Sequence, residues 1–118
     1  MERIMLKSKI HRAVVTDANL NYEGSISICP KLMKSANLIE FEKVDVYNIN
    51  NGERFSTYVI KGNLNEICLN GAAARHVQPE DKVIIASYIH IKETKINKFK
   101  PSLVYVNNLN SEIKNNKI

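Results

Sequence analysis

The segment Tyr22-Glu23-Gly24-Ser25 contains a residue pair that could break its own peptide bond. A serine hydroxyl held against the preceding carbonyl can attack it and move the acyl group from nitrogen to oxygen. The glycine lacks a Cβ, so the bond can adopt strained conformations that are closed to other residues. Elimination of the resulting ester leaves dehydroalanine, which hydrolyses to a pyruvoyl group at a new N-terminus. Taken alone, Gly-Ser is more often an ordinary turn.

The cysteines and histidines are too scattered to predict a metal site. Cys29 and Cys68 form no CxxC pair, and His11, His76 and His90 stand far apart. Two lone cysteines in a cytoplasmic chain are usually reduced core residues. We therefore expect no bound metal. The sequence leaves open only a set of metal ligands that the fold brings together from distant positions.

The net charge of +5 is concentrated near the C-terminus. Residues 1–90 carry 11 Lys/Arg against 10 Asp/Glu, whereas residues 91–118 carry six Lys against two Glu. This distribution predicts a flexible, solvated tail over roughly 107–118. A nucleic-acid surface would interleave basic and aromatic residues on a folded face, so we expect no nucleic-acid partner.

Length and composition predict one soluble domain spanning residues 1–118. The chain is 44% hydrophobic and 25% charged, as in ordinary globular proteins. No apolar run approaches the ~20 residues of a membrane span, and the N-terminus lacks a signal-peptide core. We expect a cytoplasmic protein with no membrane contact. A chain of this size buries only about two-thirds of its surface, so subunit contacts would help to stabilise it.

The elements that must position Gly24 and Ser25 are mostly short strands. Residues 44–49 alternate apolar and polar, and 53–60 form a second strand candidate. Asn51-Gly52 between them is a strong hairpin signal, because both residues tolerate positive φ. Further strands are expected at 4–10, 13–16, 26–29, 66–69, 83–91 and 103–106, with helical turns at 30–36 and 71–75. The pattern predicts a small, mainly β barrel or sandwich with short helical turns.

Three further segments complete a pattern around Gly24-Ser25. They are Met5-Leu6-Lys7-Ser8-Lys9-Ile10-His11-Arg12, Asn51-Gly52-Glu53-Arg54-Phe55-Ser56-Thr57-Tyr58 and Asn70-Gly71-Ala72-Ala73-Ala74-Arg75. In this order and spacing the chain resembles the bacterial aspartate 1-decarboxylases of pantothenate biosynthesis, and Val83-Ile84-Ile85-Ala86-Ser87-Tyr88 continues the match. The resemblance covers roughly residues 1–106.

This resemblance implies a six-stranded double-psi β-barrel in a homotetramer with sites between subunits. It implies self-cleavage at Gly24-Ser25 into a β chain of residues 1–24 and an α chain of residues 25–118. Ser25 would become the covalently bound pyruvoyl group, with no pyridoxal phosphate. The pyruvoyl ketone would form a Schiff base with L-aspartate and accept electrons during its decarboxylation to β-alanine and CO2.

The resemblance also assigns roles to individual side chains. Tyr58 matches the proton donor, and a phenol is protonated at neutral pH, as a donor must be. Arg54 and Lys9 are the expected carboxylate anchors, because Arg offers a planar fork and Lys a point charge. Asn70 and His11 are expected to support the site.

Thr57 matches a substrate-contacting position that the family also uses in self-cleavage, and Gly71, Ala72 and Ala73 match a backbone cradle for substrate. Thr57 should face the opposite side of its strand from Tyr58. Both can serve one site only if the strand twists or bulges, if Thr57 acts through its backbone, or if two subunits meet there.

Two other functions stay open at this point. One is a non-enzymatic basic β-barrel that binds nucleic acid or a protein partner. The other is a pyruvoyl-dependent decarboxylase of another amino acid.

Overall fold

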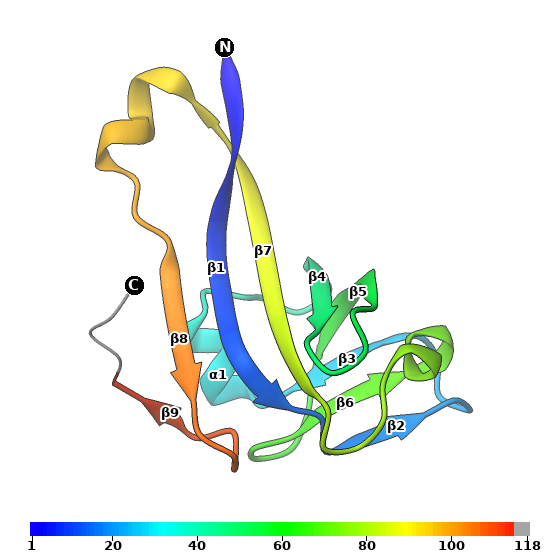
Figure 1. Ribbon diagram of the computed structural model, residues 1–118. Coiled ribbons are helices and arrows are strands. Elements are labelled where there is room, and N and C mark those ends of the chain that lie inside the picture. Colours follow the sequence, from blue (N-terminus) through cyan, green and yellow to red (C-terminus); the bar gives the residue numbers. More distant parts are fainter. Residues whose placement is uncertain (115–118) are drawn as a thin grey trace.

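The computed structural model describes residues 1–114 and consists mostly of strands (Figure 1). The strands are β1 (Glu2–Val14), β2 (Asp17–Asn19), β3 (Ser25–Ile28), β4 (Lys43–Asn48), β5 (Arg54–Lys61), β6 (Ile67–Asn70), β7 (Lys82–Lys92), β8 (Ser102–Val106) and β9 (Glu112–Ile113). One α-helix, α1 (Pro30–Ser35), and two 3₁₀ helices, η1 (Gly71–His76) and η2 (Glu93–Lys98), lie between them.

The strands form one sheet in the order β2-β6-β3-β5-β4-β7-β1-β8-β9. Three neighbouring pairs are parallel, namely β1 with β8, β2 with β6, and β3 with β5. The sheet curls, so that Thr16, just after β1, donates its N–H to the Ile67 carbonyl on β6 at 2.8 Å. Fully buried aliphatic residues from strands all round the sheet fill its inside, among them Ile10, Ile26, Val46, Ile67 and Ile85. The prediction of a small, mainly β barrel with short helical turns is confirmed.

β1 and β7 form the longest antiparallel pair, from Glu2 opposite Lys92 to Val14 opposite Lys82. The outer halves of both strands extend away from the rest of the molecule and carry η2 (Figure 1). The register shifts between Ile10 and Ala13, where Arg12 has φ 64°. The two strands expected at 4–10 and 13–16 are therefore largely one strand interrupted by an irregularity.

The hairpin predicted at Asn51-Gly52 is present between β4 and β5. Gly52 has φ 77° and donates its N–H to the Asn48 carbonyl at 2.9 Å. The Asn48 N–H is bonded to the Glu53 carbonyl at 2.8 Å, which closes the turn. Glycine fits here because it adopts positive φ without steric cost.

The stretch expected to be a flexible tail begins as packed structure. Asn110 is only 2% exposed. Its side chain accepts from the Val14 N–H at 2.7 Å and donates to the carbonyls of Val14 and Asn65 at 2.8 and 3.1 Å. β9 then pairs with β8. These contacts fix Asn110 and β9, and residues 115–118 of the predicted tail lie outside the described residues, so a flexible tail stays a prediction.

The cysteines, the possible metal ligands and the helices bear on what the composition predicts. Cys29 and Cys68 are buried free thiols, as expected. Across residues 1–114, no three or more His, Cys, Asp and Glu side chains gather where a metal ion could bind. No helix in that part of the chain is both long and apolar enough for a membrane crossing.

Candidate active site

Ser25 is the first residue of β3 and has an unusual backbone conformation. Its φ is 121°, a region that residues with a Cβ rarely adopt. The residue is 1% exposed, so its hydroxyl lies inside the protein although Gly24 before it is exposed. Strain of this kind persists only where the surrounding structure enforces it, and it is concentrated at functional sites.

The strands on either side of β3 bring two of the predicted site residues to Ser25. β5 runs parallel to β3 with Val59 opposite Ile26, which places Tyr58 alongside Ser25. On the other side, Asn70 of β6 lies directly opposite Ser25. Residues distant in the sequence therefore meet at the Gly24-Ser25 bond.

Asn70 holds the Ser25 hydroxyl in a defined position. Its Nδ2 donates to Ser25 Oγ at 3.1 Å and to Ser27 Oγ at 3.0 Å. Its Oδ1 accepts from Cys68 Sγ at 3.2 Å. Burial, followed by the charges of Asp17 and Glu66, raises the pKa of Cys68 to about 11, so this thiol stays protonated and can donate. The support expected from Asn70 therefore has a specific geometry.

Gly71 packs its backbone directly on the segment before Ser25. It has φ 61°, and a Cβ there would lie 2.8 Å from both Cα and N of Gly24 and 3.0 Å from the Tyr22 carbonyl oxygen. No larger residue fits without moving backbone atoms. Ala72 is exposed and Ala73 is half-buried against the core. The predicted cradle at 71–73 thus adjoins the predicted cleavage point.

Tyr58 is 39% exposed, and its ring borders Gly24. A Cβ added to Gly24 would lie 4.0 Å from Tyr58 Cε1. The Tyr58 ring is also 6.5 Å from that of Phe41, whose backbone N–H is bonded to the Val59 carbonyl at 2.7 Å. The phenol therefore lies at the surface next to the buried Ser25.

Glu42 fixes the loop that carries Phe41. Its Oε2 lies 2.7 Å from both Lys7 Nζ and Ser87 Oγ, and Oε1 accepts from the Ile39 N–H at 3.1 Å. Burial opposes ionisation of this carboxyl, but the hydrogen bonds from Lys7, Ser87 and the Ile39 N–H, together with the Lys7 charge, lower the pKa of Glu42 overall. The loop next to Tyr58 is thus tied to β1 and β7.

Thr57 lies on the opposite side of β5 from Tyr58, as the sequence predicted. The pairing of β5 with β4 is regular from Tyr58 opposite Lys43 to Arg54 opposite Tyr47, with no bulge. Arg54, Ser56 and Tyr58 are exposed on one face, whereas Thr57 is half-buried on the other. A bulge therefore does not bring Thr57 and Tyr58 to one face.

Arg54 lies on the outer face of the barrel, four residues before Tyr58 on β5. Four strand residues span about 13 Å, so its backbone is distant from Ser25. Its guanidinium carbon is 4.1 Å from the centre of the Tyr47 ring. Within residues 1–114 no carboxylate forms an ion pair with Arg54, in contrast to Arg3, which pairs with Glu93 at 2.9 Å.

Lys9 is also distant from Tyr58 along the sheet. It lies on β1 opposite Ala86 of β7. β7 and β4 stand between β1 and β5, and three strand spacings amount to about 14 Å. Lys9 nevertheless shares the outer face with Arg54, because Ala86 pairs with Asp45 and Asp45 with Ser56.

His11, the other expected support, has no contact with Ser25 either. Its Nδ1 is buried with no hydrogen-bond partner among the residues described, and its ring meets that of Tyr105 edge-on at 5.6 Å. Burial, and then the charges of Lys9 and Arg12, lower the pKa of His11. Its surroundings favour a neutral imidazole.

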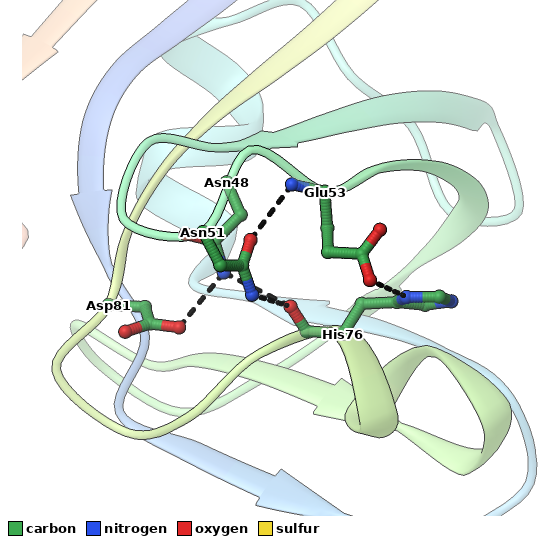
Figure 2. A network of polar contacts seen from close by, with 5 residues as sticks. All are labelled: Asn48, Asn51, Glu53, His76 and Asp81. Atoms are coloured by element: carbon green, nitrogen blue, oxygen red, sulfur yellow. Dashed lines mark hydrogen bonds and ion pairs between the residues drawn. The ribbon is translucent and has the colours of Figure 1, made fainter.

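A polar network that the sequence did not reveal anchors the hairpin before Arg54 (Figure 2). The His76 carbonyl accepts from Asn48 Nδ2 at 3.1 Å and from Asn51 Nδ2 at 3.0 Å. Asn48 Nδ2 also donates to Asp81 Oδ2 at 2.9 Å, and His76 Nδ1 lies 3.5 Å from Glu53 Oε1. The network fixes the β4–β5 hairpin to the end of η1, whose other end is Gly71. No local signal predicts it, because the partners that it joins lie 23 to 33 residues apart.

Comparison with known proteins identifies the family of this chain. The family model described as "Aspartate decarboxylase" matches residues 1–113. The aspartate 1-decarboxylase of Campylobacter concisus is 66% identical over 93% of this chain and 96% of its own length. Those of Bdellovibrio bacteriovorus and a Hydrogenobaculum species are 61% and 58% identical, over 87% and 94% of this chain and 83% and 89% of their own lengths. The chain belongs to the aspartate decarboxylase family.

Proposed function

We propose that this protein decarboxylates L-aspartate to β-alanine and CO2 and so supplies pantothenate biosynthesis. The observation that carries the proposal is the arrangement at Ser25. The serine has a strained φ of 121°, its Oγ accepts from Asn70 at 3.1 Å, and the preceding Gly24 lies against Tyr58 and Gly71. Family membership supports the same reaction.

The cofactor in this proposal is a pyruvoyl group made from Ser25. Ser25 Oγ attacks the Gly24 carbonyl carbon, the C–N bond breaks, and the freed nitrogen takes up a proton. Loss of the Cα proton expels the Gly24 carboxylate and leaves dehydroalanine, and water then replaces the nitrogen, which leaves as ammonia. Relief of the backbone strain at Ser25 favours the first step. We assign Thr57, which precedes Tyr58 on β5, to assist the attack of Ser25 Oγ on the Gly24 carbonyl.

Once formed, the pyruvoyl group would supply a ketone that condenses with the substrate amine and withdraws electrons from Cα. Tyr58 returns a proton to that carbon, a role that its exposed position beside Gly24 and Ser25 allows. The backbone of Gly71, Ala72 and Ala73 borders the same point and confines the substrate. These residues all belong to one chain.

Arg54 and Lys9 bind the substrate carboxylates. Both lie on the outer face, about 13 and 14 Å by backbone spacing from the strand positions around Tyr58. We therefore propose that sites form between subunits of a homotetramer, where the outer face of one copy closes the Ser25 region of another.

Intact-mass spectrometry tests self-processing directly. Wild-type protein should separate under denaturing conditions into fragments of 24 and 94 residues, the latter being 118 minus 24. Ser25→Ala should stay full length and inactive, because nucleophile and pyruvoyl source are lost together. CO2 release measured across several amino acids then identifies the substrate. A wild-type chain that stays whole and inactive would refute the proposal, and release from another amino acid alone would reassign its substrate.

A further inference from the structure

On the outer face, the side chains of Arg54, Tyr47 and Tyr88 contact one another in sequence. The proposed reaction assigns no role to the two tyrosines. Tyr47 and Arg54 lie directly opposite each other on β4 and β5, and the guanidinium stacks over the Tyr47 ring at 4.1 Å. The Tyr47 hydroxyl is 2.8 Å from the hydroxyl of Tyr88 on β7. Three adjacent strands thus contribute one side chain each to a chain of contacts that ends at Arg54.

The contacts of Asp45 leave the Arg54 charge available. Asp45 lies between the two tyrosines on this face and is the nearest acidic residue on β4. Its Oδ1 accepts a hydrogen bond from Ser56 Oγ at 2.5 Å. The Arg54 guanidinium stacks on Tyr47 without an ion pair to any acid in residues 1–114. A carboxylate from outside can therefore bind to it.

Tyr47 and Tyr88, the tyrosine pair, restrict the motion of the Arg54 side chain, which would otherwise reduce its affinity for a ligand. An exposed arginine has several rotatable bonds, and fixing them when a ligand binds reduces affinity. Stacking on the Tyr47 ring limits the guanidinium to one position. This works only if the Tyr47 ring itself has a fixed orientation. Tyr88 holds its far end, and burial together with the Tyr88 hydrogen bond raises the pKa of Tyr47 to about 12, so the hydroxyl stays protonated.

We propose that Tyr47 and Tyr88 are positioning residues that hold the Arg54 guanidinium in place for the side-chain carboxylate of aspartate. Tyr88 then contributes to substrate recognition without touching substrate. This inference rests on the proposed function, because it requires Arg54 to be a substrate anchor.

The test compares hydroxyl deletions in cleaved enzyme. Tyr88→Phe keeps the ring, and the residue is 44% exposed, so folding and cleavage should be unaffected. The KM for aspartate should rise by about 2–10-fold, the worth of one hydrogen bond, with little change in kcat. Tyr47→Phe should have the same effect. The double variant should be no worse than either single one, because both remove one shared bond.

Tyr105→Phe is the matched control. It removes a buried hydroxyl on β8 that has no hydrogen-bond partner within residues 1–114, and it should leave KM unchanged. Equal increases in KM for Tyr105→Phe and Tyr88→Phe, additive effects in the double variant, or an unchanged KM in Tyr88→Phe would each overturn the positioning role.

Arg54→Ala, measured beside these variants, separates failure of this inference from failure of the proposed anchor. A raised KM in Arg54→Ala with a normal KM in Tyr88→Phe would remove only the tyrosine pair. A normal KM in Arg54→Ala would remove Arg54 as the anchor and the tyrosine pair with it.

Discussion

The surroundings of Ser25 and the outer face around Arg54 differ in how completely a single chain builds them. At Ser25 the hydroxyl and its partner Asn70 are buried and hydrogen-bonded, and Gly71 fits against Gly24 so closely that a Cβ would clash at 2.8 Å. Around Arg54 the side chains are exposed or half-buried, and Lys9 lies on a strand three spacings, about 14 Å, from β5 along the sheet. The surroundings of the Ser25 hydroxyl are thus complete within one chain, whereas the separation of Arg54 and Lys9 from Tyr58 is the reason for the proposed assembly of copies.

The largest effect that separates the two regions is expected for Tyr58→Phe. This change removes one hydroxyl and little volume, so the chain should fold and cleave normally. Turnover should fall by about 10²–10⁴-fold, because a general acid is lost. Mass spectrometry of the fragments and CO2 release from the same sample measure both quantities. Near-normal turnover in a fully cleaved variant would assign proton donation to another group or to water.

Gly71→Ala is expected to damage cleavage itself. Positive φ and the clash with Gly24 add strain of about 1–3 kcal/mol, which corresponds to roughly 5–150-fold in rate if it disturbs the alignment of Ser25. Gly52→Ala is the matched control. It has a similar φ of 77° but nothing within 4 Å of the added Cβ, so it should cost about 1 kcal/mol of stability and leave cleavage intact.

Time courses of fragment formation, together with thermal unfolding, distinguish the two glycine variants. Equal cleavage rates in both would show that contact between Gly71 and Gly24 is unimportant for processing.

Much of the fold and of the candidate site could be predicted from the sequence, because the signals for them are local. Asn51-Gly52 predicted the hairpin through the need for positive φ, and alternation over 44–49 and 53–60 predicted β4 and β5. The family motifs contain Ser25, Tyr58 and residues 71–73, which the fold brings together. Short elements were missed, because β2, β9 and η2 are too brief or too polar to produce a periodic pattern.

The remaining features depend on long-range contacts. Asn110 looks like part of a polar tail, yet it is buried because Val14 and Asn65 supply partners 96 and 45 residues away. The network around His76 and the strained φ of Ser25 likewise exist only once distant strands meet. Local sequence carries no trace of such partners.

On the outer face, Arg54→Ala should alter substrate choice and leave cleavage unchanged. In the wild type we expect the order aspartate, glutamate, asparagine. One added methylene reduces kcat/KM by about 10–200-fold, and loss of the substrate's charge leaves the cation unpaired, which costs more. Arg54→Ala should lower kcat/KM for aspartate and reduce the ratio of kcat/KM for aspartate to kcat/KM for asparagine. Unchanged discrimination in the cleaved variant would leave the anchor role to Lys9.

The smallest effect concerns acid stability and the loop that joins the two regions. Because the folded pKa of Glu42 is lowered, its contribution to stability is present above the ordinary pKa and is lost as the pH falls through the folded value. Glu42→Gln should therefore be less stable than wild type at neutral pH, and the difference should shrink in acid. Denaturant unfolding at several pH values measures this, and a difference independent of pH would contradict the ionised role of Glu42.

The mass of the longer fragment tests self-processing at Ser25 most directly. Conversion of Ser25 to a pyruvoyl group predicts a fragment of residues 25–118 that is lighter by one ammonia than the same fragment with a serine N-terminus. That fragment should react with a carbonyl reagent, and its N-terminus should resist sequencing. A fragment with the full serine mass and a free amine, or an active chain that remains uncut, would contradict formation of the cofactor from Ser25.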